Sequence, residues 1–203
     1  MKIIIIGAGP GGYETAVLAA KRGVEVVLIE SGHVGGTCLN EGCIPTKTLL
    51  YSAKIYDYAK HSKEYGVTFG SAEIDHAFVV NRKNGVVKQL VAGVGAKMKK
   101  SGVEVVKATA VIKERSSEGF VVTADGKEYV GKQLLIATGS SPALPPIDGL
   151  KDSLANGFAL TNREVLDLPA IPKTIVVVGG GVIGLEMAYY FASVGVKVTV
   201  IEM

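Results

Sequence analysis

An internal repeat constrains the fold of this chain more than any other feature of its sequence. IIIIGAGPGGYETAVLAAKRGVEVVLIE at residues 3–30 recurs 172 residues later as IVVVGGGVIGLEMAYYFASVGVKVTVIE at residues 175–202, with 12 of 28 positions identical. Each copy holds a short apolar run, a G-x-G-x-x-G motif, a helical stretch and a second apolar run that ends in glutamate. Continuous short apolar runs are typical of strands buried on both faces of a parallel sheet. The repeat therefore predicts two βαβ units in an α/β fold.

The glycine motif in each copy has the spacing of a dinucleotide-binding turn. In such a turn the first glycine makes the bend, the second lets the backbone approach a pyrophosphate, and the third allows the helix to pack on the strand. The N-terminus of the helix then offers backbone N–H groups to the phosphates. One motif alone is a weak signal, and a glycine-rich turn that binds nothing is the alternative. Two motifs in complete βαβ context predict two dinucleotide sites.

A carboxylate closes both copies at the same distance from the first glycine. Gly7 precedes Glu30 by 23 residues, and Gly179 precedes Glu202 by 23 residues. A carboxylate at the end of the second strand accepts hydrogen bonds from a ribose diol and repels a 2′-phosphate. Glu202 therefore favours NAD over NADP at the second site.

Composition narrows the class of protein. Hydrophobic residues make up 48% of the 203 residues and charged residues 20%, which is typical of a globular chain with a real core. A net charge of +3 is too small to indicate a nucleic-acid partner. The apolar run of four in MKIIIIGAGP is too short for a signal peptide or a membrane span. We expect a cytoplasmic protein with neither nucleic acid nor membrane as a partner.

The residues between the repeats predict helices, a hairpin and a connector. Helical patterns cover 44–60 and about 76–100, and Asp125-Gly126 is a hairpin turn between two alternating runs. Strands are expected near 103–106, 108–113, 119–124, 127–131 and from 133. The prolines of 142–149 and 168–172 indicate a connector between two domains. Because a doubly wound half needs a further strand, we expect a fragment, or a chain completed by another.

Cys38 and Cys43 are the two cysteines of the chain, and three uses are open to them. Zinc would need two further ligands, and the three histidines are not spaced to supply them. A structural bridge is uncommon in reducing compartments. Five residues of regular helix rise about 7.5 Å, more than the roughly 4.4–6.8 Å that a disulfide spans. A bridge therefore requires an irregular backbone, which Asn40, Gly42 and Pro45 allow, and such a bridge is easily reduced. These arguments favour a redox pair.

Together, these motifs resemble those of a known family. GGTCLNEGCIPTK at 35–47, both glycine motifs and ATG at 137–139 are similar to the flavin-dependent pyridine nucleotide-disulfide oxidoreductases over the whole chain. The cysteine segment looks most like the dihydrolipoyl dehydrogenase branch, and glutathione and mercuric reductases are similar there too. The resemblance implies a Rossmann-like doubly wound FAD-binding domain with a β-hairpin insertion at 1–145. It implies the connector and first βαβ unit of a Rossmann-like NAD-binding domain at 146–203. Family chains are more than twice as long.

The resemblance also implies a role for each motif residue. Cys43 would lie against the flavin ring, Cys38 would exchange with a dithiol substrate, and Lys47 near the flavin would pair with Glu186. The residues implied in FAD binding are Gly7, Gly9, Pro10, Gly11, Gly12, Glu30, Gly36, Thr37, Cys38, Lys47, Ala110, Ala137, Thr138 and Gly139. Those implied in NAD binding are Gly179, Gly181, Val182, Ile183, Gly184 and Glu202. No metal site is expected.

The implied reaction is the oxidation of protein-bound dihydrolipoamide to lipoamide through a Cys38–Cys43 disulfide and FAD, with NAD as hydride acceptor. The implied partners are the lipoamide-bearing acyltransferase or carrier domains of 2-oxoacid dehydrogenase complexes, and the parent enzyme is a homodimer. In this family a His–Glu pair of the partner subunit acts as acid and base, and no residue here matches it, so full activity is not expected of this chain alone. The alternatives are a glutathione- or mercuric-reductase type of enzyme and a non-catalytic flavin-binding redox module.

Overall fold

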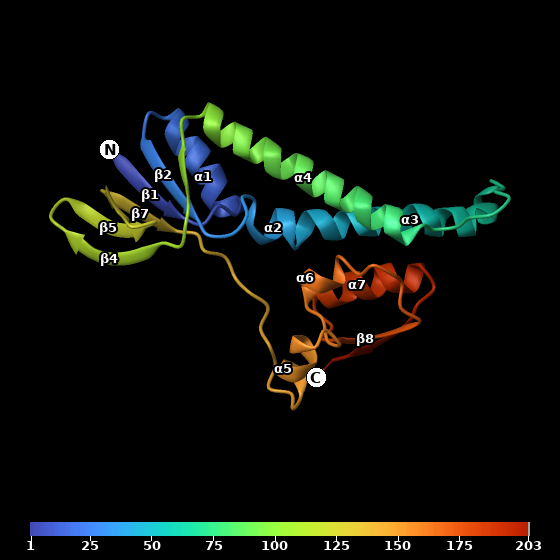
Figure 1. Ribbon diagram of the computed structural model, residues 1–203. Helices are drawn as coiled ribbons and strands as arrows, with labels where there is room; N and C mark the ends of the chain where they lie inside the picture. The colour runs from blue at the N-terminus through green and yellow to red at the C-terminus, as the bar shows by residue number, and fades with distance from the viewer. Residues whose placement is uncertain (203) are drawn as a thin grey trace. The chain divides into compact units, whose positions relative to one another are not determined.

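The computed structural model describes residues 1–202, and the chain divides into two compact units (Figure 1). The first unit comprises residues 1–40 and 87–141, and the second comprises residues 41–86 and those from 142 onward. Met203, where the second predicted domain ends, lies outside the described residues. The predicted boundary at residue 145 separates an FAD-binding from an NAD-binding domain. It differs from the division into these two units, and it stays a prediction.

A four-stranded parallel sheet forms the centre of the first unit. Its strand order is β3-β2-β1-β7, so that β1 and β2 occupy the middle. The strands are β1 (Lys2–Ile6), β2 (Glu25–Glu30), β3 (Glu104–Lys107) and β7 (Gln133–Ile136). The helices that belong wholly to this unit are α1 (Pro10–Lys21) and α2 (Gly36–Asn40).

Both faces of the central strands are buried, and the side chains alternate between two cores. Ile5 and Leu28 face α1, together with Met98 from the end of α4 (His76–Lys100). Their neighbours Ile4 and Val27 point the other way, into a second cluster. This period of two in an all-apolar run explains why the strands read as continuous hydrophobic segments.

A three-stranded antiparallel sheet supplies that second cluster. It contains β4 (Val111–Ser116), β5 (Gly119–Ala124) and β6 (Lys127–Gly131), and in Figure 1 β4 and β5 lie on the side of the parallel strands opposite α1. Val122 and Ala124 are buried against the parallel sheet. The β5–β6 turn has Asp125 at φ 51° and Gly126 at φ 70°, as the predicted two-residue hairpin turn requires.

The second unit contains the second βαβ repeat and the helices that cover it. Strands β8 (Thr174–Val178) and β9 (Lys197–Ile201) pair in parallel and are joined by α7 (Val182–Ser193). The remaining elements are α3 (Cys43–His61), the 3-10 helix η1 (Ser62–Tyr65), α5 (Leu150–Ala155), α6 (Asn162–Val165) and residues 76–86 of α4.

The core of this unit lies between α3, α4 and α7. Leu49 of α3 and Val79 of α4 pack with Tyr190 and Phe191 of α7. Tyr190 is fully buried, and His76 satisfies its hydroxyl through Nδ1 at 2.8 Å. Burial raises the pKa of Tyr190 to about 12.

The predicted α/β class is confirmed, with a parallel sheet and an antiparallel insertion of three strands. Within residues 1–202, none of the helices is both long and apolar enough to cross a membrane. The same residues contain no cluster of three or more histidine, cysteine or acidic side chains placed to hold a metal ion.

Candidate functional site

The first glycine motif lies where the strand order of the parallel sheet reverses. Successive strands β1, β2 and β3 run to one side, while β7 lies on the other side of β1. Ligands of open α/β sheets bind at such a point, at the carboxyl ends of the strands. Gly7 and Ala137 follow β1 and β7 there, and the Ala137 N–H donates to the carbonyl of Ile6 at 2.8 Å. A Cβ on Gly7 would come within 2.2 Å of the Ala137 carbonyl oxygen, so only glycine fits.

A third segment approaches the same loop. The Gly35 N–H donates to the Ala8 carbonyl at 2.8 Å, and a Cβ on Gly36 would come within 2.7 Å of the Gly9 Cα. Thr37 follows Gly36 in the first turn of α2, and Thr138 and Gly139 follow Ala137. The structure therefore brings together three segments that the sequence assigns to one cofactor: 7–12, 35–37 and 137–139.

The glycines of the first motif do different things. A Cβ on Gly12 would come within 1.8 Å of the Gly7 carbonyl oxygen, so this glycine is needed for the packing of α1 on β1. A Cβ on Gly9 would meet nothing closer than 3.9 Å, and one on Gly11 would meet nothing within 4 Å. Pro10 opens α1, and no side chain caps the helix. Open space in front of an uncapped helix N-terminus suits a phosphate group.

Glu30 is held against the glycine loop. Its Oε2 accepts from the Ala8 N–H at 2.6 Å, and its Oε1 accepts from the Gly32 N–H at 2.5 Å. The segment after β3 lies next to it, because the Ala108 N–H donates to the Glu30 carbonyl at 3.0 Å. Ala110, further along this segment, is half-buried against the core under the antiparallel sheet.

The second motif repeats this construction in the second unit. Gly179 has φ 107°, and a Cβ on Gly184 would come within 2.2 Å of the Gly179 carbonyl oxygen. The Glu202 carboxylate accepts from the Gly180 N–H, as Glu30 does from Ala8. Gly181 precedes the first turn of α7 with open space around it. Val182 and Ile183 follow in that turn, and both are exposed.

The two cysteines flank a break between two helices. Cys38 lies half-buried in α2, and Cys43 is the exposed first residue of α3. Residues 41 and 42 interrupt the helical run, with Gly42 at φ −143° and ψ −109°. This is the irregular backbone that the spacing of the cysteines requires, and the pairing of the two sulfurs stays a prediction.

Lys47 lies one helical turn after Cys43. Its Nζ forms an ion pair with Oε1 of Glu186, which projects from the first half of α7. Since residues four apart share one face of a helix, Cys43 and Lys47 lie on the same side of α3. The residue pair expected from the sequence is therefore present, and its role at a flavin stays a prediction.

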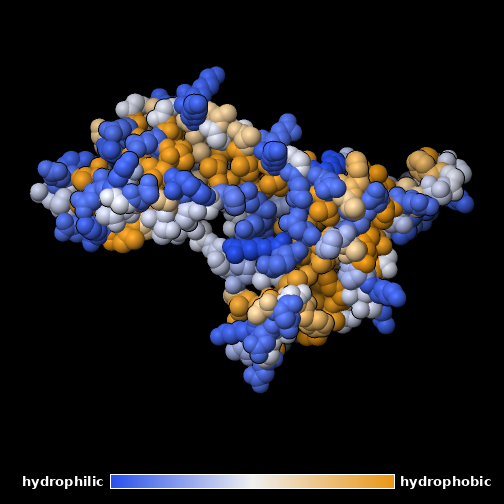
Figure 2. Space-filling view, viewed as in Figure 1, coloured by the Kyte–Doolittle hydropathy of each residue, from blue (hydrophilic) through white to orange (hydrophobic). Residues whose placement is uncertain are grey.

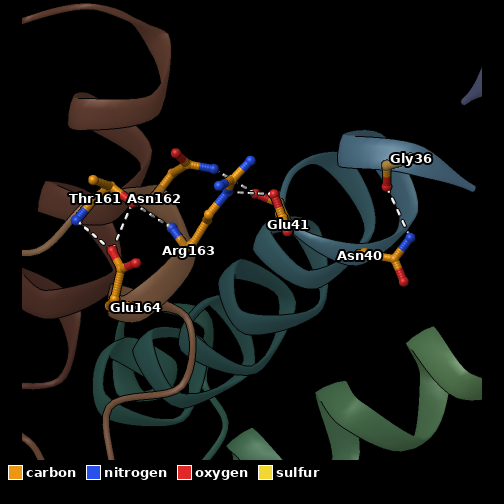
Figure 3. Close-up of polar contacts among 7 residues, drawn as sticks. All are labelled: Gly36, Asn40, Glu41, Thr161, Asn162, Arg163 and Glu164. Atoms are coloured by element: carbon orange, nitrogen blue, oxygen red, sulfur yellow. Dashed lines mark hydrogen bonds and ion pairs between the residues drawn. The ribbon is translucent and has the colours of Figure 1, made fainter. Parts of the chain in front are cut away.

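Sequence reasoning missed one group of residues, in α6, that contacts Glu41 (Figure 3). Asn162 and Arg163 both contact Glu41, which stands between Cys38 and Cys43 in the sequence. The sole local signal for α6 is the Thr161-x-x-Glu164 capping box. The contact joins residues about 120 positions apart, and no local pattern predicts it.

Comparisons with known proteins identify the family of this chain. The profile of the family "Pyridine nucleotide-disulphide oxidoreductase" matches residues 1–203. The dihydrolipoyl dehydrogenase of Acholeplasma laidlawii is 49% identical over 203 residues, covering 100% of this chain and 59% of that protein.

Two solved structures have the same fold. LpdA from Mycobacterium tuberculosis superposes with a TM-score of 0.83 at 28% identity, covering 100% of this chain and 44% of that one. The Cu(II) complex of the HOCl-induced flavoprotein disulfide reductase RclA from Escherichia coli gives 0.82 at 31% identity, covering 98% and 41%. The chain thus spans about half the length of the proteins it matches. The family profile matches residues 1–203 of this chain, so the chain belongs to the pyridine nucleotide-disulphide oxidoreductases.

Proposed function

We propose that this chain is the FAD- and NAD-binding part of a dihydrolipoyl dehydrogenase. The FAD domain would occupy residues 1–145, and the connector and first βαβ unit of the NAD domain would occupy 146–203. The FAD domain would be Rossmann-like and doubly wound with a β-hairpin insertion, and the second part would be the start of a Rossmann-like NAD domain. One observation carries the proposal: two dinucleotide turns accompany a cysteine pair that flanks a helix break, with Lys47 one turn beyond it.

The residues of the first unit fit FAD. The pyrophosphate would pass over Gly9, Pro10 and Gly11, where the backbone leaves space and α1 offers its uncapped N-terminus. Glu30 would hold the adenosine ribose from its place at the end of β2, and Ala110 would meet the adenine. Gly36, Thr37 and the Ala137–Gly139 turn converge on the same loop and would line the phosphate and ribityl side.

The residues of the second unit fit NAD. Gly181 leaves room for a pyrophosphate at the start of α7, and the Glu202 carboxylate lies at the end of β9. A carboxylate at this place prefers a ribose diol to a 2′-phosphate. Val182 and Ile183 would flank the nicotinamide half.

The cysteines would carry the dithiol chemistry. A thiolate of dihydrolipoamide attacks the Cys38 sulfur of the bridge, which forms a mixed disulfide and releases Cys43 as a thiolate. The second substrate thiolate then attacks the substrate sulfur of the mixed disulfide, which closes the lipoamide ring and releases Cys38. The substrate has lost two electrons and the protein holds a dithiol. FAD, held by the residues of the first unit, would supply the two-electron acceptor for this dithiol, and NAD⁺ would be the final hydride acceptor.

Lys47 and Glu186 would set the charge beside the reacting cysteine. Lys47 lies on the face of α3 that begins with Cys43, and its ammonium group favours an anionic sulfur. Glu186 fixes the position of the ammonium group and balances its charge when no thiolate is present. The dithiol would be delivered by lipoamide-bearing acyltransferase or carrier domains of a 2-oxoacid dehydrogenase complex, to an enzyme that works as a homodimer.

The test is a spectrum followed by a turnover assay on the 203-residue chain. The chain is purified, supplied with FAD, and titrated with dihydrolipoamide before NAD⁺ is added. We expect a flavin spectrum, a long-wavelength band on dithiol addition, and NADH formation at a rate well below full activity, because no residue here matches the acid and base pair of the family. Cys43→Ser should abolish the band, while Cys38→Ser should keep the band and abolish turnover.

Other outcomes separate the alternatives. Turnover with glutathione disulfide or mercuric ion in place of lipoamide would identify a sister reductase. A chain that binds FAD and titrates its cysteines, but turns over none of these substrates, would be a redox module without this activity. A colourless protein would contradict FAD binding by this part of the chain.

A further inference from the structure

The backbone between the two cysteines is tied to α6 at a single residue. The Glu41 carbonyl accepts from Nδ2 of Asn162 at 2.8 Å, and the Glu41 carboxylate accepts from Nε of Arg163 at 2.6 Å (Figure 3). One contact holds the main chain and the other holds the side chain. We call these two contacts the Glu41 clamp. Cys43 follows two residues later.

The clamp projects from an element that is itself fixed. The Thr161 N–H and Oγ1 donate to Oε2 of Glu164 at 2.7 and 2.6 Å, and the Arg163 N–H donates to Thr161 Oγ1 at 3.2 Å. The hydroxyl of Thr161 holds the pKa of Glu164 below its usual value. Four residues are too few for a stable helix on their own, so the capping box and the packing of Val165 and Leu166 in the core order α6.

The residue before Glu41, Asn40, is also held by its side chain, through contacts within the first unit. Its Nδ2 donates to the carbonyls of Val34 and Gly36, at 3.1 and 2.8 Å. Residues 40 and 41 are therefore both anchored by side chains, and Gly42 is the one residue left to absorb the turn before Cys43. Its backbone lies outside the helical region, and the first turn of α3 closes on it through the Thr46 N–H at 3.0 Å.

We propose that Asn162 and Arg163 are positioning residues for the redox pair: the Glu41 clamp fixes the segment that leads into Cys43. This rests on the redox role proposed above. Asn162 and Arg163 both contact Glu41, and we expect them to act on the cysteines through it. A preorganised segment raises the effective concentration of one thiol at the other, because less freedom is lost when the bridge closes.

The reaction that reports on the clamp is exchange with glutathione. The two protein thiols give two electrons and two protons to one glutathione disulfide, and the products are the Cys38–Cys43 bridge and two glutathione thiols. The equilibrium constant, in molar units, is the effective concentration of the pair. It is measured by acid quenching and mass spectrometry across glutathione ratios, and needs neither flavin nor substrate.

The variants are Arg163→Gln, Asn162→Ala and their combination. Each single change should lower the effective concentration about 3- to 10-fold, the range of one hydrogen bond. The charge-reversed pair Glu41→Arg with Arg163→Glu should recover part of the loss of Arg163→Gln. Lys113→Gln is the matched control, because Lys113 and Glu128 form an ion pair of the same 2.6 Å length and similar exposure in the antiparallel sheet. It should leave the equilibrium unchanged.

The outcomes distinguish this role from the proposed enzyme activity. Equal effective concentrations in the wild-type chain and the clamp variants would overturn the positioning role, whatever the turnover assay gives. A wild-type chain that never forms the bridge would overturn it together with the redox role of the cysteines. A clamp-dependent bridge would support the clamp even in a chain that does not oxidise dihydrolipoamide.

Discussion

Gly12 is needed for the packing of the first motif, whereas we expect Gly9 to be needed for cofactor binding. Substitutions at the two positions should therefore affect different properties. Gly12→Ala drives a methyl group into the Gly7 carbonyl and should destabilise the first unit. Gly9 has φ −69° and space for a methyl group at its Cβ position, so the fold should tolerate Gly9→Ala. If FAD lies there, Gly9→Ala should weaken FAD binding by tenfold or more, with less than about 0.5 kcal/mol change in unfolding free energy. Urea unfolding and flavin titration check both.

The equivalent glycine of the second motif provides the control. Gly181 has nearly the same backbone as Gly9 and nothing within 4 Å of its Cβ position. Gly181→Ala should weaken NADH binding and leave FAD binding unchanged. Equal loss of FAD in the two variants would refute the assignment of one nucleotide to each motif.

Glu202 decides the choice of dinucleotide in the proposed NAD site. Glu202→Arg replaces a ribose acceptor by a guanidinium group that pairs with a 2′-phosphate. NADH should bind about tenfold more weakly and NADPH more tightly, as followed by fluorescence titration. Glu202→Gln, which removes the charge and adds no cation, should weaken NADH with little gain for NADPH. An unchanged preference in both variants would remove Glu202 from the ribose site.

Tyr190 makes the stability of the second unit fall at high pH. Its folded-state pKa of about 12 lies above the usual value of 10, because burial disfavours the phenolate. A raised pKa stabilises the fold below pH 10, and the contribution is lost as the pH rises from 10 towards 12. The full loss is roughly 2 to 3 kcal/mol.

Tyr190→Phe tests whether Tyr190 causes this loss of stability at high pH. At pH 8 it should be less stable by about 1 to 3 kcal/mol, because the buried His76 Nδ1 loses its partner. Between pH 10 and 12 its stability should decline less steeply than that of the wild-type chain. Tyr65→Phe, at a position 79% exposed, should keep the wild-type pH profile in urea unfolding. Parallel curves for Tyr190→Phe and the wild-type chain would contradict the assignment.

Among the elements, those with a dense local signal could be predicted and those made by distant contacts could not. The helices expected at 44–60 and about 76–100 are α3 and α4, and the turn at Asp125 is present. The strand expected at 108–113 begins only at Val111, because Ala108 still bonds to β2. Helices α5 and α6 have six and four residues, too few for a periodic pattern to show.

The same division holds within the candidate site. The glycine turns and the cysteine segment are contiguous motifs, so their residues could be named from the sequence alone. The contacts of Glu41 with Asn162 and Arg163 depend on how a four-residue helix packs, which no motif encodes. No sequence pattern indicated the role of His76 either, which is a buried hydrogen-bond partner of Tyr190.

The hairpin between β5 and β6 offers a prediction for one element. Asp125 is the sole non-glycine residue with positive φ among those described, and asparagine tolerates this conformation as well as aspartate does. Asp125→Val should therefore destabilise the first unit by about 1 to 2 kcal/mol, whereas Asp125→Asn should change it little. Thermal unfolding of the two variants distinguishes the backbone effect from a general sensitivity of the turn, which would affect both equally.

For the molecule as a whole, the two units differ in how their sheets are covered. The parallel sheet of the first unit is buried on both faces. In the second unit α7 covers one face of the β8–β9 pair, and Val176, Val178 and Ile201 on the other face are 48 to 60% exposed. Figure 2 shows apolar side chains at the surface in the region of α7 and β8. Contiguous exposed apolar surface favours association.

We therefore expect the isolated chain to self-associate as its concentration rises, and the β8–β9 face to be responsible. Val176→Thr with Val178→Thr keeps a β-branched residue with strand preference at both positions while making the exposed face more polar. Sedimentation velocity should show a lower weight-average mass for this variant, with an unfolding midpoint close to that of the wild-type chain. Val111→Thr, on an equally exposed valine of the antiparallel sheet, is the control and should associate as the wild-type chain does. If it lowers the association as much, the effect is one of overall hydrophobicity, and the β8–β9 face has no special part in it.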